Sequence, residues 1–110
     1  MDRPAPTPET SFFWDVAEPF LDDPATTVGT LMKFPCLRVD GSFFATCDHR
    51  TGDLIVKLPR LRVVELIGDG DAEPFAPAGR TFNEWVAVPH RDEPTWQALL
   101  AEARAHATGG

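Results

Sequence analysis

The chain has 110 residues, 43% of them hydrophobic, and a formal net charge of −7 at pH 7. This length suits one domain with one core, so residues 1–110 are expected to form a single domain, and the composition excludes a disordered chain. The negative charge repels polyphosphates and anionic lipid, so a nucleic-acid role would need a local basic patch. The chain has no apolar run long enough to span a bilayer and no signal-peptide pattern, which predicts a cytoplasmic protein without a membrane partner.

The beginning of the chain predicts a loosely ordered segment followed by a helix. Residues 1–6 are rich in proline and are expected to be loosely ordered. Thr7 is an N-cap residue, and Pro8 after it favours the first helical position. Apolar residues then recur at helical spacing and define the expected buried stripe: Phe13, Val16, Ala17 and Phe20. Pro24, which follows two aspartates, is expected to end this helix.

Consecutive hairpins are expected next. Asp40-Gly41 is a two-residue hairpin signal between residues 36–39 and residues 42–47. After a further turn, residues 53–58 alternate with period two and predict another strand. Strands joined by short turns pair side by side, so the sheet is expected to be mainly antiparallel.

The expected register of these strands sorts their side chains into two faces. Pairing Val39 with Ser42 places both cysteines, read as reduced, on the same face as diagonal neighbours. That face is assigned to the core: Phe34, Cys36, Phe43, Ala45, Cys47, Leu54, Val56 and Leu58. The reverse face carries Leu37, Val39, Phe44, Thr46, Ile55 and Lys57.

At Pro59 the pattern changes from period two to helical spacing. Residues 53–58 are therefore expected to run directly into a helix that ends at Gly68, with Pro59 in its first turn. The expected buried stripe of this helix is Val63, Val64 and Ile67.

The remaining elements are two strands and a helix. Residues 73–75 predict a short edge strand, and residues 81–89 predict the last strand. Glu84 falls on the apolar side of that strand, so it is expected near a sheet end or beside a cation such as Arg80. Asp92 is the expected cap of the final helix, whose buried stripe is Trp96, Leu99, Leu100, Ala103 and Ala107.

The order α-β-β-β-α-β-β-α predicts a two-layer α+β domain. Its mainly antiparallel sheet is expected to have five strands, with three helices on one face and the other face left open by its own chain.

An ordered series of segments is also familiar: Gly29-Thr30-Leu31-Met32-Lys33-Phe34-Pro35-Cys36-Leu37-Arg38-Val39, Phe43-Phe44-Ala45, Asp53-Leu54-Ile55-Val56-Lys57-Leu58-Pro59, Glu73-Pro74-Phe75 and Gly79-Arg80-Thr81-Phe82-Asn83-Glu84-Trp85-Val86-Ala87-Val88-Pro89. The series resembles the MmcQ/YjbR family and the related N-terminal domain of TfoX/Sxy proteins, from about Val28 to the final helix. The resemblance implies a small domain of the kind also seen in secretion chaperones, with a five-stranded antiparallel sheet. It also implies DNA binding, because family members are commonly labelled so and the TfoX/Sxy relatives regulate competence genes. It supplies no catalytic residues.

Two groups of residues are candidates for binding. The densest basic group in this acidic chain is Lys57, Arg60 and Arg62, which Arg80 could join. It would contact phosphates or an acidic partner, or else form a solvated surface balanced by acids such as Glu65. The second candidate is the open sheet face, represented by Leu37, Phe44, Ile55 and Trp85, where a contiguous apolar patch would mark an interface or a groove.

We expect no catalytic site, no metal site and no cofactor. His49, His90 and His106 do not have metal-ligand spacing, and no paired cysteine motif is present. Cys47 lies near His49 in sequence, but the strand pattern points the thiol into the core.

Three hypotheses for function follow. The first is a small non-enzymatic binding or regulatory module that engages a protein partner or a second copy of itself through the open face or the basic group. The second is a DNA-binding regulator of the MmcQ/YjbR or TfoX-like type. The third is a small-ligand binder with a pocket beside Trp85 and Lys57.

Overall fold

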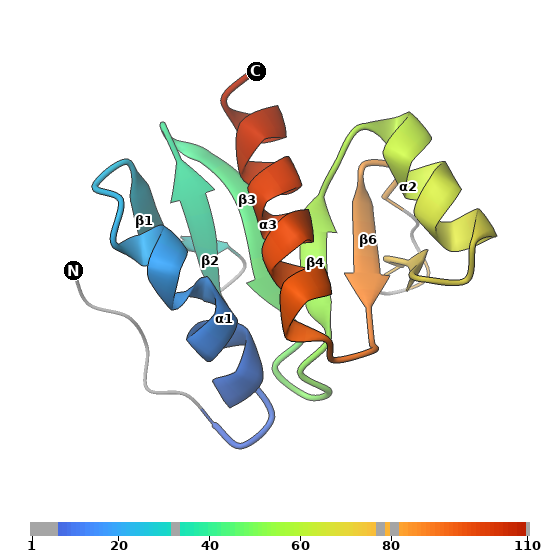
Figure 1. Ribbon diagram of the computed structural model, residues 1–110, viewed down its shortest axis with the longest axis horizontal. Coiled ribbons are helices and arrows are strands. Elements are labelled where there is room, and N and C mark those ends of the chain that lie inside the picture. Colours follow the sequence, from blue (N-terminus) through green and yellow to red (C-terminus); the bar gives the residue numbers. More distant parts are fainter. Residues whose placement is uncertain (1–6, 32–33, 77–78, 80–81, 110) are drawn as a thin grey trace.

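The computed structural model describes residues 7–31, 34–76, 79 and 82–109. In this part of the chain, six strands form one antiparallel sheet in the order β1-β2-β3-β4-β6-β5, accompanied by three helices (Figure 1). Along the chain the elements are α1 Ser11–Leu21, β1 Thr26–Leu31, β2 Phe34–Val39, β3 Ser42–Cys47, β4 Leu54–Lys57, α2 Arg60–Gly68, β5 Glu73–Pro74, β6 Trp85–Val88 and α3 Glu93–Ala107. The expected α+β class is therefore confirmed, whereas the expectation for residues 1–6 lies outside the described residues.

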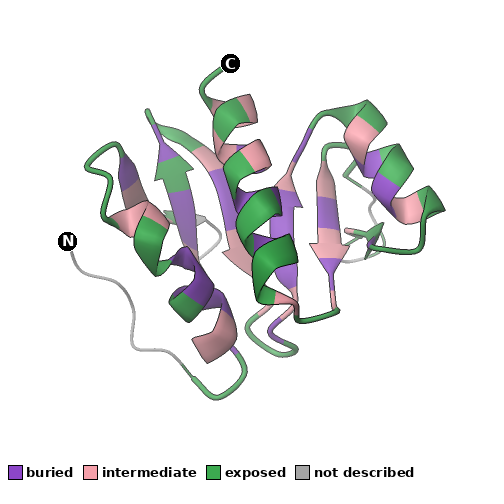
Figure 2. Ribbon diagram, in the orientation of Figure 1, coloured by how far each residue is buried: buried purple, intermediate pink, exposed green. Residues whose placement is uncertain are grey.

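The helices and the sheet form two layers. α1 and α3 lie across one face of the sheet, and α2 lies beyond β6 at the end of the sheet far from β1 (Figure 1). The strands are mostly buried where the helices cross them, and the outward sides of the helices are exposed (Figure 2). Within the described residues no helix covers the opposite face of the sheet.

The sheet has one strand more than the five expected. β1 pairs along its whole length with β2, from Thr26 opposite Val39 to Leu31 opposite Phe34. The sequence pattern becomes strand-like from Val28, but it does not separate this strand from the next one. β1 forms one edge of the sheet, and the two-residue β5 forms the other, as expected for a short edge strand.

A β-bulge in β3 reverses the faces expected for β2. Val39 pairs with Ser42, as predicted, but Leu37 pairs with Ala45, so β3 contains one extra residue at Phe44. Since alternate side chains point to opposite faces, this one-residue shift turns Leu37 and Val39 towards the helices.

The expected faces therefore need correction. Leu37 and Phe44 are fully buried in the core, and the prediction that they lie on the uncovered face is wrong. Phe43 lies on the opposite face, where its ring contacts the position that a Cβ on Gly29 would occupy. The two free cysteines also lie on opposite faces, because Cys36 is adjacent to the inward-facing Leu37, whereas Cys47 is two residues after the inward-facing Ala45.

The direct passage of β4 into α2 is confirmed. Pro59 precedes the first helical residue, and its carbonyl accepts a hydrogen bond from the amide of Val63 at 3.0 Å. The expected stripe of α2 is only partly right: Val63 is buried, but Leu66 is the second buried residue and Val64 is exposed.

The final helix matches its expected pattern. The side chain of Asp92 accepts a hydrogen bond from the amide of Thr95 at 3.1 Å, which caps the helix. The expected buried residues are confirmed at Trp96, Leu99, Leu100 and Ala103. The Trp96 indole donates to the carbonyl oxygen of His90 at 2.8 Å, which joins α3 to the end of β6.

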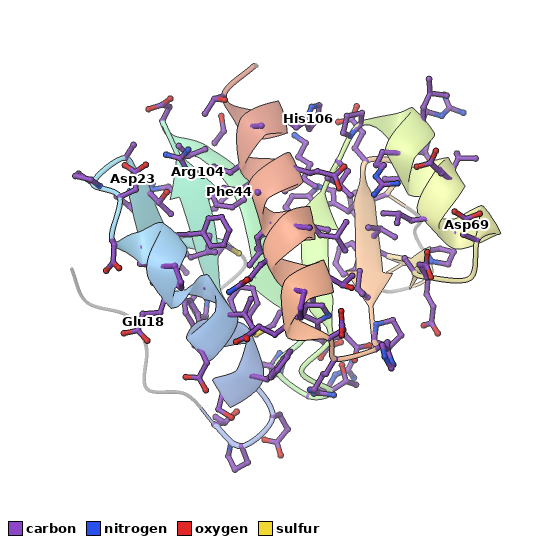
Figure 3. All side chains as sticks on the ribbon, in the orientation of Figure 1. Glu18, Asp23, Phe44, Asp69, Arg104 and His106 are labelled. Atoms are coloured by element: carbon purple, nitrogen blue, oxygen red, sulfur yellow. The ribbon has the colours of Figure 1, made fainter. Side chains whose placement is uncertain are left out.

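The first helix begins later than expected. Thr7 does not cap it, because residues 7–10 form a separate turn in which the amide of Thr7 donates to the hydroxyl of Thr10 at 2.9 Å. At its other end α1 is tied to α3: the Arg104 guanidinium donates to Asp23 at 2.7 Å and to the hydroxyl of Thr26 at 2.9 Å. Figure 3 shows Arg104 reaching from α3 towards Asp23, beside Phe44.

Candidate functional site

A groove lies where β4 passes into α2 and β6 begins. Lys57, the last residue of β4, is directly opposite Trp85, the first residue of β6. The amide of Leu58 donates to the carbonyl oxygen of Glu84 at 2.9 Å, which holds the two segments together. Between them is an open concavity of about 420 Å³, which we call the corner groove; it is lined by Lys57, Arg60, Phe82, Asn83, Glu84 and Trp85.

The side chains of the two cations in the corner groove have no partner within the described residues. Neither the Lys57 ammonium nor the Arg60 guanidinium forms a hydrogen bond or an ion pair with them. Each of the other described arginines contacts a protein oxygen: Arg38 contacts Thr27, Arg50 contacts Asp48, Arg62 contacts Glu65 and Glu102, Arg91 contacts Thr51, and Arg104 contacts Asp23 and Thr26. In a chain with a net charge of −7, two basic side chains left free beside one concavity favour an anionic ligand there.

Arg62 does not belong to the groove, although the sequence groups it with Lys57 and Arg60. Its guanidinium donates to both carboxylate oxygens of Glu102 on α3, at 2.9 and 3.1 Å, and it also contacts Glu65. The hydrogen bond to Glu102 is the largest of the effects that raise the pKa of Arg62 above its ordinary value. The partly exposed Arg62 charge therefore joins α2 to α3 and is not one of the unpartnered cations.

Aromatic side chains form one wall of the groove. The rings of Phe82 and Trp85 both lie against Phe75, at centroid distances of 5.9 and 6.4 Å. Trp14 and Trp96 are buried in the core, so Trp85 is the tryptophan that a bound ligand could reach. Rings held by their neighbours offer a flat, ordered surface beside the cations.

The most exposed apolar side chains also lie at this end of the molecule. Among the described residues, the large hydrophobic side chains that remain exposed are Leu61 at 83%, Val64 at 60% and Phe82 at 38%. The first two belong to α2, and the third lines the groove.

The structure thus combines parts of both sequence-predicted sites. Lys57 and Arg60 from the basic group meet Trp85 from the predicted open face. Ile55 lies between the core residues Leu54 and Val56, so its side chain does face the uncovered side of the sheet. It is only 5% exposed, however, and offers little surface for a ligand. Arg80 lies outside the described residues.

Sequence reasoning missed three lining residues, Phe82, Asn83 and Glu84, because it placed them inside a strand. β6 begins only at Trp85, so they precede the strand and reach the groove. One signal was available: Glu84 is an acidic residue on the supposed apolar side of that strand, which indicates a later strand start.

Cys47 is the residue that the sequence offers for nucleophilic chemistry. The pKa of the Cys47 thiol is raised from its ordinary value of 9.0 to about 12, chiefly because burial disfavours the thiolate, with Asp48 and Cys36 adding to the effect. A thiol in that state is a poor nucleophile at neutral pH. In the described part of the chain, no cluster of three or more His, Cys, Asp or Glu side chains could hold a metal ion.

Within the same described ranges, no helix combines the length and the apolar character needed to cross a membrane.

No protein-family model, no curated protein and no solved structure gives a significant match to this chain.

Proposed function

We propose that the protein is a small non-enzymatic binding module whose ligand-contacting surface is the corner groove. The observation that carries this proposal is the pair of unpartnered cations, Lys57 and Arg60, that share one concavity with Trp85. The groove has a volume of about 420 Å³ and is open to solvent, so a ligand could contact both cations and Trp85 at once.

The chemistry of the groove favours a ligand with an anionic group and an apolar part. The two cations can pair with a carboxylate or a phosphate, and Phe82 and Trp85 can pack against an apolar group. Glu84 also lines the groove, so the local charge of the groove is only moderately positive. This arrangement fits selective binding of one acidic group better than the broad basic surface that tracks a nucleic-acid backbone.

A YjbR-like domain is part of the same proposal. Its support is the ordered resemblance that runs from Val28 to the final helix, together with the antiparallel sheet and its helices on one face; the six strands are one more than the resemblance implies.

NMR titration of the ¹⁵N-labelled protein tests the proposed binding site. The probes are short acidic peptides, nucleoside monophosphates and a short DNA duplex, added separately. We expect the acidic peptides to shift the Trp85 indole signal and the amides of residues 82–85 at probe concentrations that leave the Trp14 and Trp96 indole signals in place.

The matched variants separate a specific site from general charge attraction. Lys57→Gln with Arg60→Gln should abolish the shifts, whereas Arg38→Gln with Arg50→Gln removes the same charge at exposed positions elsewhere and should preserve them. Shifts that are confined to another surface, or that survive the first pair of substitutions, would refute the proposal.

A further inference from the structure

Exposed apolar side chains adjoin the free cations of the corner groove. Burying large hydrophobic side chains is favourable, so a fold that leaves several of them together in solvent commonly marks a contact surface. The most exposed large apolar residues in the described part of this chain are Leu61, Val64 and Phe82. None of them belongs to the buried core.

Helix geometry connects two of these residues to the groove. Residues three and four positions apart are neighbours on a helix, so Val64 adjoins both Arg60 and Leu61. Arg62 is held on the side of α2 that faces α3, through its contact with Glu102. Arg60, Leu61 and Val64 therefore form a continuous strip, here called the α2 strip, on the other side of the helix, and its first residue lines the groove.

We infer that the corner groove and the α2 strip together form one docking surface for an acidic, amphipathic segment of a partner protein. This inference rests on the proposed function of the groove and names its ligand. Acidic side chains of the segment pair with Lys57 and Arg60. Its apolar side chains cover Leu61 and Val64 and pack beside Phe82.

The combination of charge and apolar surface selects this occupant over other anions. A nucleotide or a small carboxylate would fill the groove but leave the α2 strip in solvent. A nucleic-acid backbone would use the two cations without needing the exposed leucine and valine. An acidic amphipathic peptide engages both features, because acids that flank its apolar face can pair with Lys57 and Arg60 while that face covers Leu61 and Val64.

Selection from a random-peptide phage library on the immobilised full chain tests the inference. We expect enriched peptides to combine Asp or Glu with large apolar residues. Fluorescein-labelled synthetic copies of the enriched peptides then give affinities by fluorescence polarisation.

Four variants locate the contact. Lys57→Glu with Arg60→Glu, and separately Leu61→Ser with Val64→Ser, should each weaken binding by about tenfold or more. Arg38→Glu with Arg50→Glu produces the same change in net charge at exposed positions elsewhere and should change affinity by less than about threefold. Glu84→Gln should strengthen binding by about twofold or more, because it removes an acid from the groove. Circular dichroism checks that each variant is folded.

The outcomes distinguish this inference from the proposed function. Peptides that depend on the two cations but not on Leu61 and Val64 would leave the groove as a binding site and overturn the extended docking surface. An enrichment without acidic residues, or binding that is insensitive to both pairs of substitutions, would overturn both proposals. If the wild type dimerises and Leu61→Ser with Val64→Ser makes it monomeric in light scattering, a second copy is the occupant and the peptide assignment is wrong.

Discussion

Arg62 of α2 and Glu102 of α3 meet in a two-point contact, with Nε 2.9 Å from Oε1 and Nη2 3.1 Å from Oε2. Both side chains are partly exposed, so solvent weakens the attraction between them. The contact lies on the same side of α2 as the buried Val63 and Leu66, which leaves Arg60, Leu61 and Val64 on the accessible side.

Glu102→Gln should lower the free energy of unfolding by about 1 kcal/mol, because it removes the charge from a bidentate pair. Chemical denaturation of the variant measures this loss. Glu65→Gln is the matched control: its pairing with Arg62 lies within one helix and is more exposed, so its loss should be smaller. Equal losses in the two variants would contradict the role assigned to the contact between the helices.

Gly52 should tolerate substitution by alanine less well than Gly41. Its φ of +81° is strained for a residue with a side chain, and an added Cβ would collide with the backbone oxygen of Glu9 and the guanidinium of Arg91. Gly41 has a similar φ of +84° but open space around its Cβ.

We therefore expect Gly41→Ala to cost about 1 kcal/mol and Gly52→Ala to cost at least about 2 kcal/mol, the difference being the steric collision. Thermal unfolding of the two variants gives the comparison. If the two costs are the same, the Glu9 carbonyl oxygen and the Arg91 guanidinium do not lie against Gly52.

Because the pKa of Cys47 is raised, the free energy of unfolding should decrease as the pH rises in the alkaline range. In the unfolded chain the thiol ionises near its ordinary pKa of 9.0, whereas in the folded protein it stays protonated up to about 12. Between these values the folded state binds more protons than the unfolded state, so stability falls as pH rises.

Cys47→Ala should remove part of this decline, and denaturation curves at pH 8 and pH 10 check it. At pH 8 the folded wild type should also react with a thiol reagent much more slowly than the denatured chain. Rapid labelling of Cys47 in the folded protein would contradict both expectations.

Duplex DNA should compete poorly with an acidic peptide for the corner groove. With Arg62 held by Glu102, Lys57 and Arg60 are the free cations among the described residues of the groove, and two phosphate contacts give a log-log salt slope of about −2. A mobility-shift titration at several salt concentrations measures the slope. A steep slope would indicate a larger basic surface and would favour the DNA-binding alternative.

The passage from β4 to α2 could be predicted from sequence because its signals are local. Leu54 and Val56 alternate with polar or outward residues, and Pro59 marks the change to helical spacing. The bulge could not be predicted in the same way. Phe43 and Phe44 are both large and apolar, so the pattern does not reveal which of them enters the core, and no glycine marks the extra residue.

The groove was predictable only in part, for a related reason. Lys57, Arg60 and Trp85 stand out by residue type, and their strand and helix assignments bring them near one another. The pairing of Arg62 with Glu102 joins residues far apart in sequence, so only the packing of α2 beside α3 removes Arg62 from the basic group.

The extra residue at Phe44 has an effect beyond its own strand. In the described sheet β1 pairs only with β2, so both strands take their orientation from this single position. Pairing the intact β3 without the bulge would place Ala45 opposite Cys36 and so present Cys36 and Gly29 to the helices in place of Leu37 and Val28. The bulge, more than the identity of any one side chain of β3, therefore decides which residues of β1 and β2 enter the core.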